Sequence, residues 1–194
     1  MQDLPVVTLL GDSISAGFGL PAASALPVRL EAAISRLGLR VRVVGAGVSG
    51  DTTADGLRRM ARDIPAETRL CVLALGANDL MQMLRPADMA QTLDEIIERL
   101  KARNIDVLLC GMRAPPWAGA YGQEFEAVFV TVAKRHGVAF YPFLLEGMAL
   151  DPAFTLSDRL HPNAAGIDVI ARGLAPVVVA ALRHVARPVI GNPS

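Results

Sequence analysis

The sequence has no excess of charge of either sign. It carries nineteen basic and nineteen acidic side chains among 194 residues, which gives a formal net charge of zero. Proteins that bind nucleic acid normally present a basic stripe, and attachment to anionic lipid needs the same sign of charge. We therefore expect no nucleic-acid partner and no electrostatic attachment to a membrane.

The sequence also has few cysteines and no long hydrophobic run. Cys71 and Cys110 lie in apolar stretches typical of strands, so we expect buried free thiols, with a disulfide between two core strands as the alternative. The apolar stretch 174–182 is about half the length of a membrane span, and we expect no membrane insertion. Residues 1–5 do not resemble a signal peptide. The expected location is cytoplasmic for the chain as it stands, or periplasmic or secreted if a signal peptide was removed.

A core of useful size can nevertheless form. The apolar share is 52%, and a chain of this length buries roughly 70% of its unfolded surface on folding. We expect one domain over residues 1–187 and a disordered tail over residues 188–194. The oligomeric state is left open between monomer and homodimer.

Short apolar runs alternate with amphipathic helical patterns along the chain. The runs predict strands at 6–10, 41–44, 70–75, 106–110 and 138–141. The patterns predict helices at 24–37, 51–62 with Asp51 as cap, 86–103, 123–136 and 162–187. This alternation predicts the α/β class: a three-layer α/β/α, flavodoxin-like fold with a central five-stranded parallel sheet. Ligands of such sheets bind beyond the carboxyl ends of the strands.

Polar and glycine residues follow three of the predicted strands. The first strand ends in Gly11-Asp12-Ser13, where a serine would project into the cleft or simply cap a helix. The second ends in the glycine-rich segment 45–50, whose N–H groups can approach an anion. The third is followed by Gly76-Ala77-Asn78-Asp79. The amide of Asn78 can direct two donors into the same cleft, although an Asx turn is the commoner use of such a pair.

A fourth segment, 157–163, places an acid close to a histidine. Asp158 and His161 are three residues apart and would share one face of a helical turn. A carboxylate in that position holds the imidazole in one tautomer and stabilises the imidazolium. His136 and His184 lie in helical patterns and are predicted to be capped or core residues.

Together these segments resemble the SGNH (GDSL-type) hydrolases. The resemblance runs through the segments 9–17, 48–52, 76–79 and 158–163, in this order and across nearly the whole chain. Within the family, the sequence looks most like the bacterial arylesterases and the acyl-CoA thioesterase/lysophospholipase type. One departure is Ala77, which stands where the family more often has a second glycine, and we expect only a small change in the loop.

The resemblance implies the roles of five residues. Ser13 would be the nucleophile, and Asp158 and His161 would complete the triad. Gly50 and Asn78 would form the oxyanion hole with the N–H of Ser13. The expected activity is hydrolysis of short- and medium-chain acyl and aryl esters, with acyl thioesters and lysophospholipids as further candidate substrates. This chemistry requires no metal and no organic cofactor.

Apolar side chains near the same edge of the sheet are candidates for binding the acyl or aryl group, with ordinary core packing as the alternative for each. The candidates are Met81, Leu84, Trp117, Tyr121, Phe143 and Phe154. Because the chain has no room for a lid domain, we expect an open and shallow site.

Two other functions are compatible with parts of the sequence. Gly45, Gly47 and Gly50 fit the spacing of an NAD(P)-binding Rossmann turn after a strand. The acid that should follow about 20 residues later is absent, because the first acid near the next strand is Asp79. A catalytically silent ligand-binding module on the same fold is the second alternative, and the filled triad positions argue against it.

Overall fold

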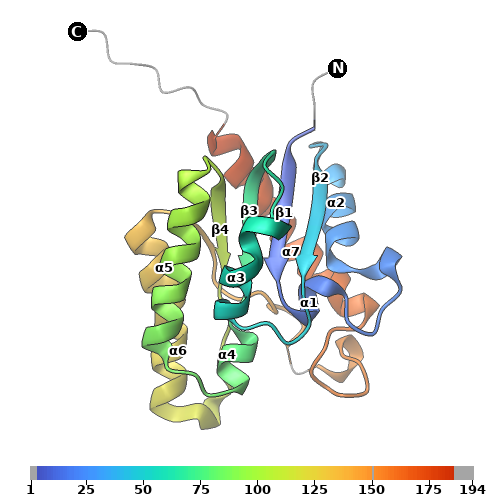
Figure 1. Cartoon of the computed structure of the whole chain (residues 1–194). Helices are drawn as coiled ribbons and strands as arrows, with labels where there is room; N and C mark the ends of the chain where they lie inside the picture. Colours follow the sequence, from blue (N-terminus) through green and yellow to red (C-terminus); the bar gives the residue numbers. More distant parts are fainter. Residues whose placement is uncertain (1–3, 150, 186–194) are drawn as a thin grey trace, which may run out of the picture.

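The computed structural model describes residues 4–149 and 151–185 (Figure 1). Its strands are β1 (Val6–Gly11), β2 (Arg42–Gly47), β3 (Thr68–Ala74), β4 (Asp106–Cys110) and β5 (Ala139–Tyr141). Its helices are α1 (Ser13–Ala16), α2 (Leu26–Arg36), α3 (Thr53–Asp63), α4 (Ala77–Met81), α5 (Pro86–Ala102), α6 (Gly119–His136) and α7 (Ala164–Val185). Three short 3-10 turns are η1 (Ala22–Ser24), η2 (Pro116–Ala118) and η3 (Pro152–Phe154).

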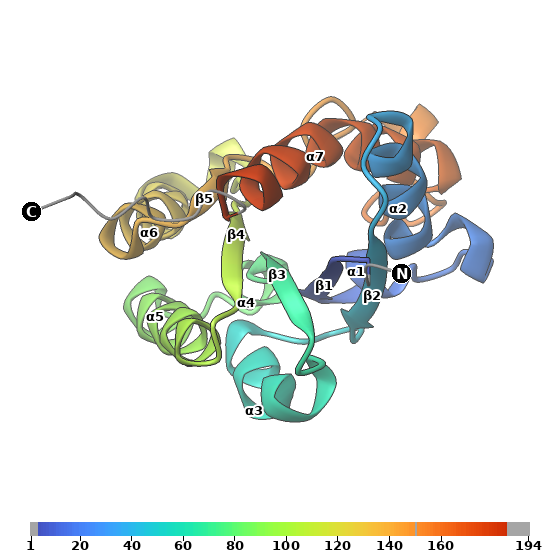
Figure 2. The same ribbon diagram turned by 90° about the horizontal axis from the view of Figure 1, so that it is seen from above.

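The strands form one all-parallel sheet in the order β2-β1-β3-β4-β5. This is the flavodoxin-like order, so the predicted fold class is confirmed. The register places Leu9 of β1 beside Gly45 of β2 and Val72 of β3. Helices α2 and α7 lie side by side over one face of the sheet, and α3, α5 and α6 cover the other (Figure 2).

The centre of the sheet is buried on both faces. Every residue of β1 is buried, and β3 and β4 consist almost entirely of buried apolar side chains. Cys71 and Cys110 lie on these two neighbouring strands as buried free thiols, and burial raises the pKa of Cys71 to about 12. A thiol with so high a pKa stays protonated and unreactive at neutral pH. Both cysteines therefore act as small core residues.

The helix α7 is the one described helix that is long and apolar enough to cross a membrane. Half of its most apolar window is buried inside the protein. Ile167, Ile170, Leu174 and Val178 are each at most 1% exposed within the core. A core helix passes the same test of length and composition, and these contacts account for the apolar face of α7.

The start of α3 differs from the prediction. Asp51 is not its cap, because Thr52 accepts a hydrogen bond from the N–H of Asp55 while the Asp55 carboxylate accepts one from the N–H of Thr52. This reciprocal arrangement is a capping box, which satisfies two N–H groups at once. The carboxylate of Asp51 instead faces the guanidinium of Arg59.

Three other helices begin at residues that differ from the predicted ones. The helix predicted at 24–37 begins at Leu26, and the one predicted at 123–136 begins at Gly119. The last helix begins at Ala164, because the Asn163 side chain accepts hydrogen bonds from the N–H groups of Ala165 and Gly166. Its predicted end at 187 and the predicted tail 188–194 lie outside the described residues.

Two glycines allow α1 to lie directly on the ends of β1 and β2. A Cβ at Gly47 would lie 2.4 Å from the backbone nitrogen of Ala16. A Cβ at Gly11 would lie 2.0 Å from Ser15 Oγ and 2.8 Å from the carbonyl oxygen of Ala74. Real Cβ atoms do not approach other atoms so closely, so these two positions require glycine. Glycine at positions 11 and 47 therefore allows the turn that begins with Ser13 to pack directly on the sheet.

Replacing Gly47 tests this contact. We expect Gly47→Ala to lower the free energy of unfolding by about 2–3 kcal/mol, because backbone must move to admit the methyl group. Gly38→Ala is the control without a close contact: Gly38 lies in the turn after α2, has a φ of 80° and has nothing within 4 Å of its would-be Cβ. The control should cost only about 1 kcal/mol for the left-handed conformation. Equal losses in urea unfolding would contradict this account.

Candidate active site

The four segments singled out in the sequence meet at the carboxyl end of the sheet. Ser13 follows β1, Gly50 follows β2 and Asn78 follows β3. Strand order reverses at β1, which is flanked by β2 and β3. Open parallel sheets bind ligands at such a reversal. Asp158 and His161 reach the same place from the loop before α7.

Ser13 is the first residue of α1, directly after the N-cap Asp12. The Asp12 carboxylate accepts a hydrogen bond from the N–H of Ile14 at 3.0 Å, and Gly17 ends the helix in the left-handed conformation. The first N–H groups of a helix have no acceptor inside it. The N–H of Ser13 makes no hydrogen bond within the described part of the chain and is available to an incoming oxygen.

A chain of hydrogen bonds joins Ser13 to His161 and Asp158. Ser13 Oγ lies 3.0 Å from His161 Nε2, and His161 Nδ1 lies 2.6 Å from Asp158 Oδ2. The hydrogen bond from His161 and two backbone N–H groups lower the pKa of Asp158 to about 2. The carboxylate is therefore ionised and accepts the proton on Nδ1, which leaves Nε2 free to accept the Ser13 hydroxyl proton. This is the relation between base and nucleophile that acyl transfer requires.

The sequence predicted that Asp158 and His161 lie on a helical turn, and this prediction is wrong. Asp158 Oδ1 accepts hydrogen bonds from the N–H groups of Leu160 and His161, so the carboxylate closes its own loop. Arg159 lies in the left-handed conformation with a φ of 57°. The spacing of three residues is correct, but an Asx-type turn produces it, because the side chain replaces the backbone acceptor of a helix.

The ring of Phe18 covers one side of the His161 imidazole. The ring centroids are 4.4 Å apart and the planes are inclined by 35°. Phe18 follows α1, and its N–H donates to the carbonyl oxygen of Ser13 at 3.0 Å. The same short segment therefore carries both the hydroxyl and an aromatic surface against the histidine. Sequence reasoning missed Phe18, because a single exposed aromatic carries no signal of its partner.

Gly50 is exposed in the loop that follows β2. Its φ is 88°, a conformation that favours glycine, and its N–H makes no hydrogen bond within the described residues. The turn that contains it is closed by the N–H of Asp51, which donates to the carbonyl oxygen of Val48 at 3.2 Å. Val48 in turn donates to the carbonyl oxygen of Gly11 at 3.1 Å. The loop after β2 is thus attached to the end of β1.

Asn78 is 6% exposed at the start of α4. Its amide does not direct two donors into the cleft, because Nδ2 donates one hydrogen bond to the carbonyl oxygen of Asp51 at 2.9 Å. One N–H of the amide remains for a ligand. Ala77 keeps an ordinary negative φ while Gly76 has a φ of 122°, so the departure from two glycines costs nothing here.

Asp79 anchors the same loop and does not face the cleft. It accepts hydrogen bonds from the N–H of Thr53 at 2.9 Å and from its hydroxyl at 2.6 Å. Burial raises the pKa of Asp79, and the two hydrogen bonds from Thr53 act in the opposite direction. Asp79 therefore braces the start of α3 against α4.

The candidate acyl-binding residues differ in their surroundings. Met81, Leu84 and Trp117 are exposed, Trp117 to 83%. The hydroxyl of Tyr121 donates to the carbonyl oxygen of Leu84 at 2.9 Å, so this tyrosine connects α6 to the loop after α4. Phe143 lies under the guanidinium of Arg113, and Phe154 packs against the core. Their predicted role in binding substrate stays a prediction.

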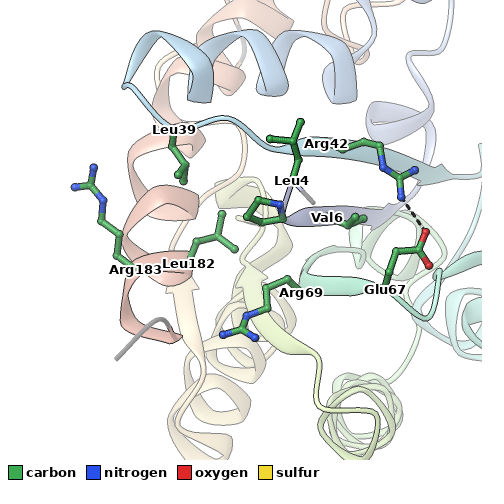
Figure 3. A pocket seen from close by; sticks show the side chains of 9 residues that line it. Leu4, Val6, Leu39, Arg42, Glu67, Arg69, Leu182 and Arg183 are labelled. Atoms are coloured by element: carbon green, nitrogen blue, oxygen red, sulfur yellow. Dashed lines mark hydrogen bonds and ion pairs between the residues drawn. The ribbon is translucent and has the colours of Figure 1, made fainter. Parts of the chain in front are cut away.

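The hollow beside Ser13 and His161 is too shallow to enclose a water molecule, and Phe18 and Ile167 contribute to its lining. A larger hollow lies at the opposite end of the sheet, around Leu4, Leu39 and Leu182 (Figure 3). Arg42 and Glu67 form an ion pair at 2.8 Å beside it. None of the described residues that line the larger hollow is a nucleophile or a histidine, and the chemistry is therefore assigned to the shallow one.

The pKa of Asp12 provides a test of the burial beside Ser13. Burial raises it from 3.8 to about 6, while the hydrogen bond from Ile14 and the charge of His161 act in the opposite direction. Folding therefore favours the protonated form, and this contribution to stability is full below about pH 4 and is lost as the pH rises through 6. An asparagine keeps the cap and never ionises.

We expect the stability of Asp12→Asn relative to wild type to increase between pH 4 and pH 7. The increase should be at most about 3 kcal/mol, from 1.36 kcal/mol for each pKa unit. Urea unfolding of both proteins across this range measures it. A difference in stability that does not change with pH would show that Asp12 ionises normally in the folded protein.

Comparison with known proteins agrees with this geometry. The family model of the GDSL-like Lipase/Acylhydrolase family matches residues 9–169. The chain is 34% identical over 176 residues to Thioesterase 1/protease 1/lysophospholipase L1 of Escherichia coli, covering 88% of this chain and 83% of that protein. It is 36% identical over 171 residues to Esterase TesA of Pseudomonas aeruginosa, covering 84% of each.

A solved structure is similar in fold as well as in sequence. The crystal structure of AlinE4, an SGNH-hydrolase family esterase, superposes with a TM-score of 0.78 at 39% identity, covering 94% of this chain and 98% of that one. Gly45 and Gly47 lie inside β2, where Gly45 makes room for Pro27 of α2 and Gly47 makes room for α1. They therefore do not form the turn of a dinucleotide site. The chain belongs to the GDSL-like lipase/acylhydrolase family of SGNH hydrolases.

Proposed function

We propose that this chain hydrolyses carboxylic esters through an acyl-enzyme on Ser13, with His161 as general base and Asp158 as its orienting acid. The observation that carries the proposal is the continuous chain of hydrogen bonds from Asp158 through His161 to Ser13 Oγ. An ionised carboxylate on Nδ1 and a hydroxyl on Nε2 define the direction in which the proton moves.

The first half of the reaction follows from these positions. As Ser13 Oγ bonds to the ester carbonyl carbon, its proton passes to His161 Nε2. Asp158 stabilises the imidazolium, and the ring of Phe18 shields one of its faces from water. When the carbon–oxygen bond to the leaving group breaks, the imidazolium gives its proton to the departing alcohol. A water molecule then repeats the sequence on the acyl-enzyme and releases the acid.

Three donors are available to stabilise the carbonyl oxygen as it becomes negative. They are the N–H of Ser13, the N–H of Gly50 and the second amide N–H of Asn78. None of the three donates a hydrogen bond within the described residues. Removal of one such donor typically costs roughly 10²–10³ in rate, because its dipole acts on charge that develops only in the transition state.

The shallow hollow favours small acyl groups. The hollow beside Ser13 and His161 is too shallow to enclose a long chain. Long acyl groups would lie along exposed apolar side chains such as Met81, Leu84 and Trp117. We expect esters and thioesters of short to medium acyl chains as substrates, with no nucleic-acid partner and no insertion into a membrane, in a monomer or homodimer.

The names of the relatives indicate which classes of ester substrate should be tested. One is called a thioesterase and lysophospholipase, and another an arylesterase from Vibrio mimicus. An acyl-enzyme can form from each of these substrates, because the leaving group departs before hydrolysis. Acyl-CoA, lysophospholipid and aryl ester assays should therefore be run in parallel.

The nucleophile is tested with p-nitrophenyl esters of increasing acyl length. We expect Ser13→Ala and His161→Ala to lower kcat by at least about 10⁴-fold, as in other serine hydrolases. Ser15→Ala is the matched control, because Ser15 lies in the same turn with a buried hydroxyl that has no partner in the described residues. The control should keep its activity. Substantial turnover by Ser13→Ala would refute the proposal.

The oxyanion hole is tested by Asn78→Ala. We expect kcat to fall by about 10²–10³ while KM changes less than threefold, because the lost hydrogen bond forms only in the transition state. Steady-state kinetics on one short ester give both constants, and a thermal melt checks that the protein is folded. A change confined to KM would show that Asn78 binds the ground state and does not stabilise the oxyanion.

A further inference from the structure

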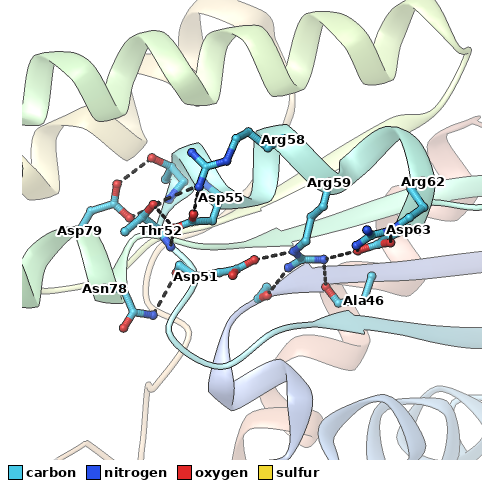
Figure 4. Close-up of polar contacts among 12 residues, drawn as sticks. Ala46, Asp51, Thr52, Asp55, Arg58, Arg59, Arg62, Asp63, Asn78 and Asp79 are labelled. Carbon is cyan, nitrogen blue, oxygen red and sulfur yellow. Dashed lines mark hydrogen bonds and ion pairs between the residues drawn. The ribbon is translucent and has the colours of Figure 1, made fainter.

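Arg59 is a buried charge that no part of the proposed reaction uses. It lies on α3 and is 9% exposed, and its guanidinium pairs with Asp51 and with Asp63 at 3.1 Å (Figure 4). Two further hydrogen bonds reach backbone carbonyl oxygens, that of Gly11 at 2.8 Å and that of Ala46 at 2.9 Å. All three nitrogens of the guanidinium are therefore engaged.

The acceptors of Arg59 lie next to the proposed oxyanion donors. Gly11 is two residues before Ser13, at the end of β1. Asp51 directly follows Gly50, and its carbonyl oxygen accepts the amide hydrogen bond of Asn78 at 2.9 Å (Figure 4). One rigid group thus joins the segments that carry the N–H of Ser13, the N–H of Gly50 and the amide of Asn78.

The loop that holds Gly50 needs such an anchor. Residues 48–50 are exposed, and a Cβ at Gly50 would meet no other atom within 4 Å. The segment is fixed on both sides, by Val48 bonded to Gly11 and by Thr53 bonded to Asp79. Between these two points, the pair of Asp51 with Arg59 is the side-chain contact that links the loop to the end of β1.

An arginine at position 59 is suited to holding neighbouring groups in a fixed geometry. A buried ion pair often adds little to stability, because both charges lose their hydration. The guanidinium is planar and presents its donors in a fixed fork, whereas an ammonium is a flexible point charge. Catalytic groups must be held within about 0.5 Å of the productive geometry by neighbours that are themselves fixed. Arg59 has the partners and the shape for this task.

From these contacts we infer that Arg59 is a positioning residue for the oxyanion hole. It holds Gly50 and, through the carbonyl oxygen of Asp51, the Asn78 amide at a set distance from the end of β1. This inference rests on the proposed esterase function. It predicts that Arg59 affects the transition state, in which all three donors act together, more than the binding of the ester.

The test compares Arg59→Lys, which keeps the charge and loses the fork, with wild type on one short p-nitrophenyl ester. We expect kcat to fall by about 10- to 100-fold with KM within about threefold, since small misplacement of catalytic groups is costly. Arg62→Lys is the matched control, because Arg62 lies on the same helix and also pairs with Asp63 but contacts neither loop. The control should keep its kcat.

A trifluoromethyl ketone provides a second readout that a role in stability alone would not change. It forms a covalent oxyanion with the serine and probes the hole directly. We expect its inhibition constant to rise in Arg59→Lys by the same factor as kcat/KM falls. The effect should shrink in an Asn78→Ala background, because one of the donors that Arg59 positions is already absent.

Each result separates the inference from the proposed function. A folded Arg59→Lys protein with kcat within twofold of wild type overturns the role of Arg59, while an inactive Ser13→Ala leaves the esterase proposal intact. If Arg59→Lys does not fold, Asp51→Asn takes its place, because it retains the carbonyl acceptor and side-chain shape but weakens the ion pair. A folded Asp51→Asn with unchanged kcat overturns the inference equally.

Discussion

The turn that begins with Ser13 packs directly against the ends of β1 and β2, because the residues that it contacts there are glycines without a Cβ. Gly11 and Gly47 leave the space, and α1 fills it with its own backbone. Because the sheet is parallel and its central strands are buried on both faces, the ends of β1, β2 and β3 are fixed relative to one another. Everything that surrounds Ser13 is attached to this frame, so the site inherits its rigidity from the sheet.

The site divides into a fixed half and an open half. On the side of β2 and β3, buried polar groups tie the loops together: Arg59 with Asp51, and Asp79 with Thr53. On the other side, Asp158 and His161 come from an exposed loop that closes on itself through the Asp158 carboxylate. This division suits the proposed chemistry. The oxyanion donors must not move as charge develops, whereas the base exchanges protons with the leaving group and with water.

Much of this arrangement could be predicted from the sequence, and the exceptions share a physical reason. Apolar runs and helical periods identified the strands and helices, and the chain order of the motifs placed Ser13, Gly50 and Asn78 at one edge of the sheet.

The cap of α3 was assigned to Asp51 and not to Thr52, because both residue types cap helices and only the contact with Arg59 decides between them. The turn at Asp158 was wrong for the same reason, since a spacing of three fits both a helix and an Asx turn. Arg59 itself was missed, because nothing in the sequence shows that it also contacts the backbone carbonyl oxygens of Ala46 and Gly11, the second of which lies 48 residues away. Tertiary contacts of this kind leave no pattern in a single sequence.

The most direct test of the central claim is to identify the residue that becomes acylated. Wild-type protein is mixed with a p-nitrophenyl ester, quenched in acid within one turnover and mapped by mass spectrometry of its peptides. The expected result is an added acyl mass on Ser13 of the wild type and none on the Ser13→Ala protein. In Asn78→Ala, the acyl-enzyme accumulates further only if the substitution slows deacylation more than acylation. An acyl group on a different residue, or turnover of the ester with no acyl-enzyme at any time, would contradict it.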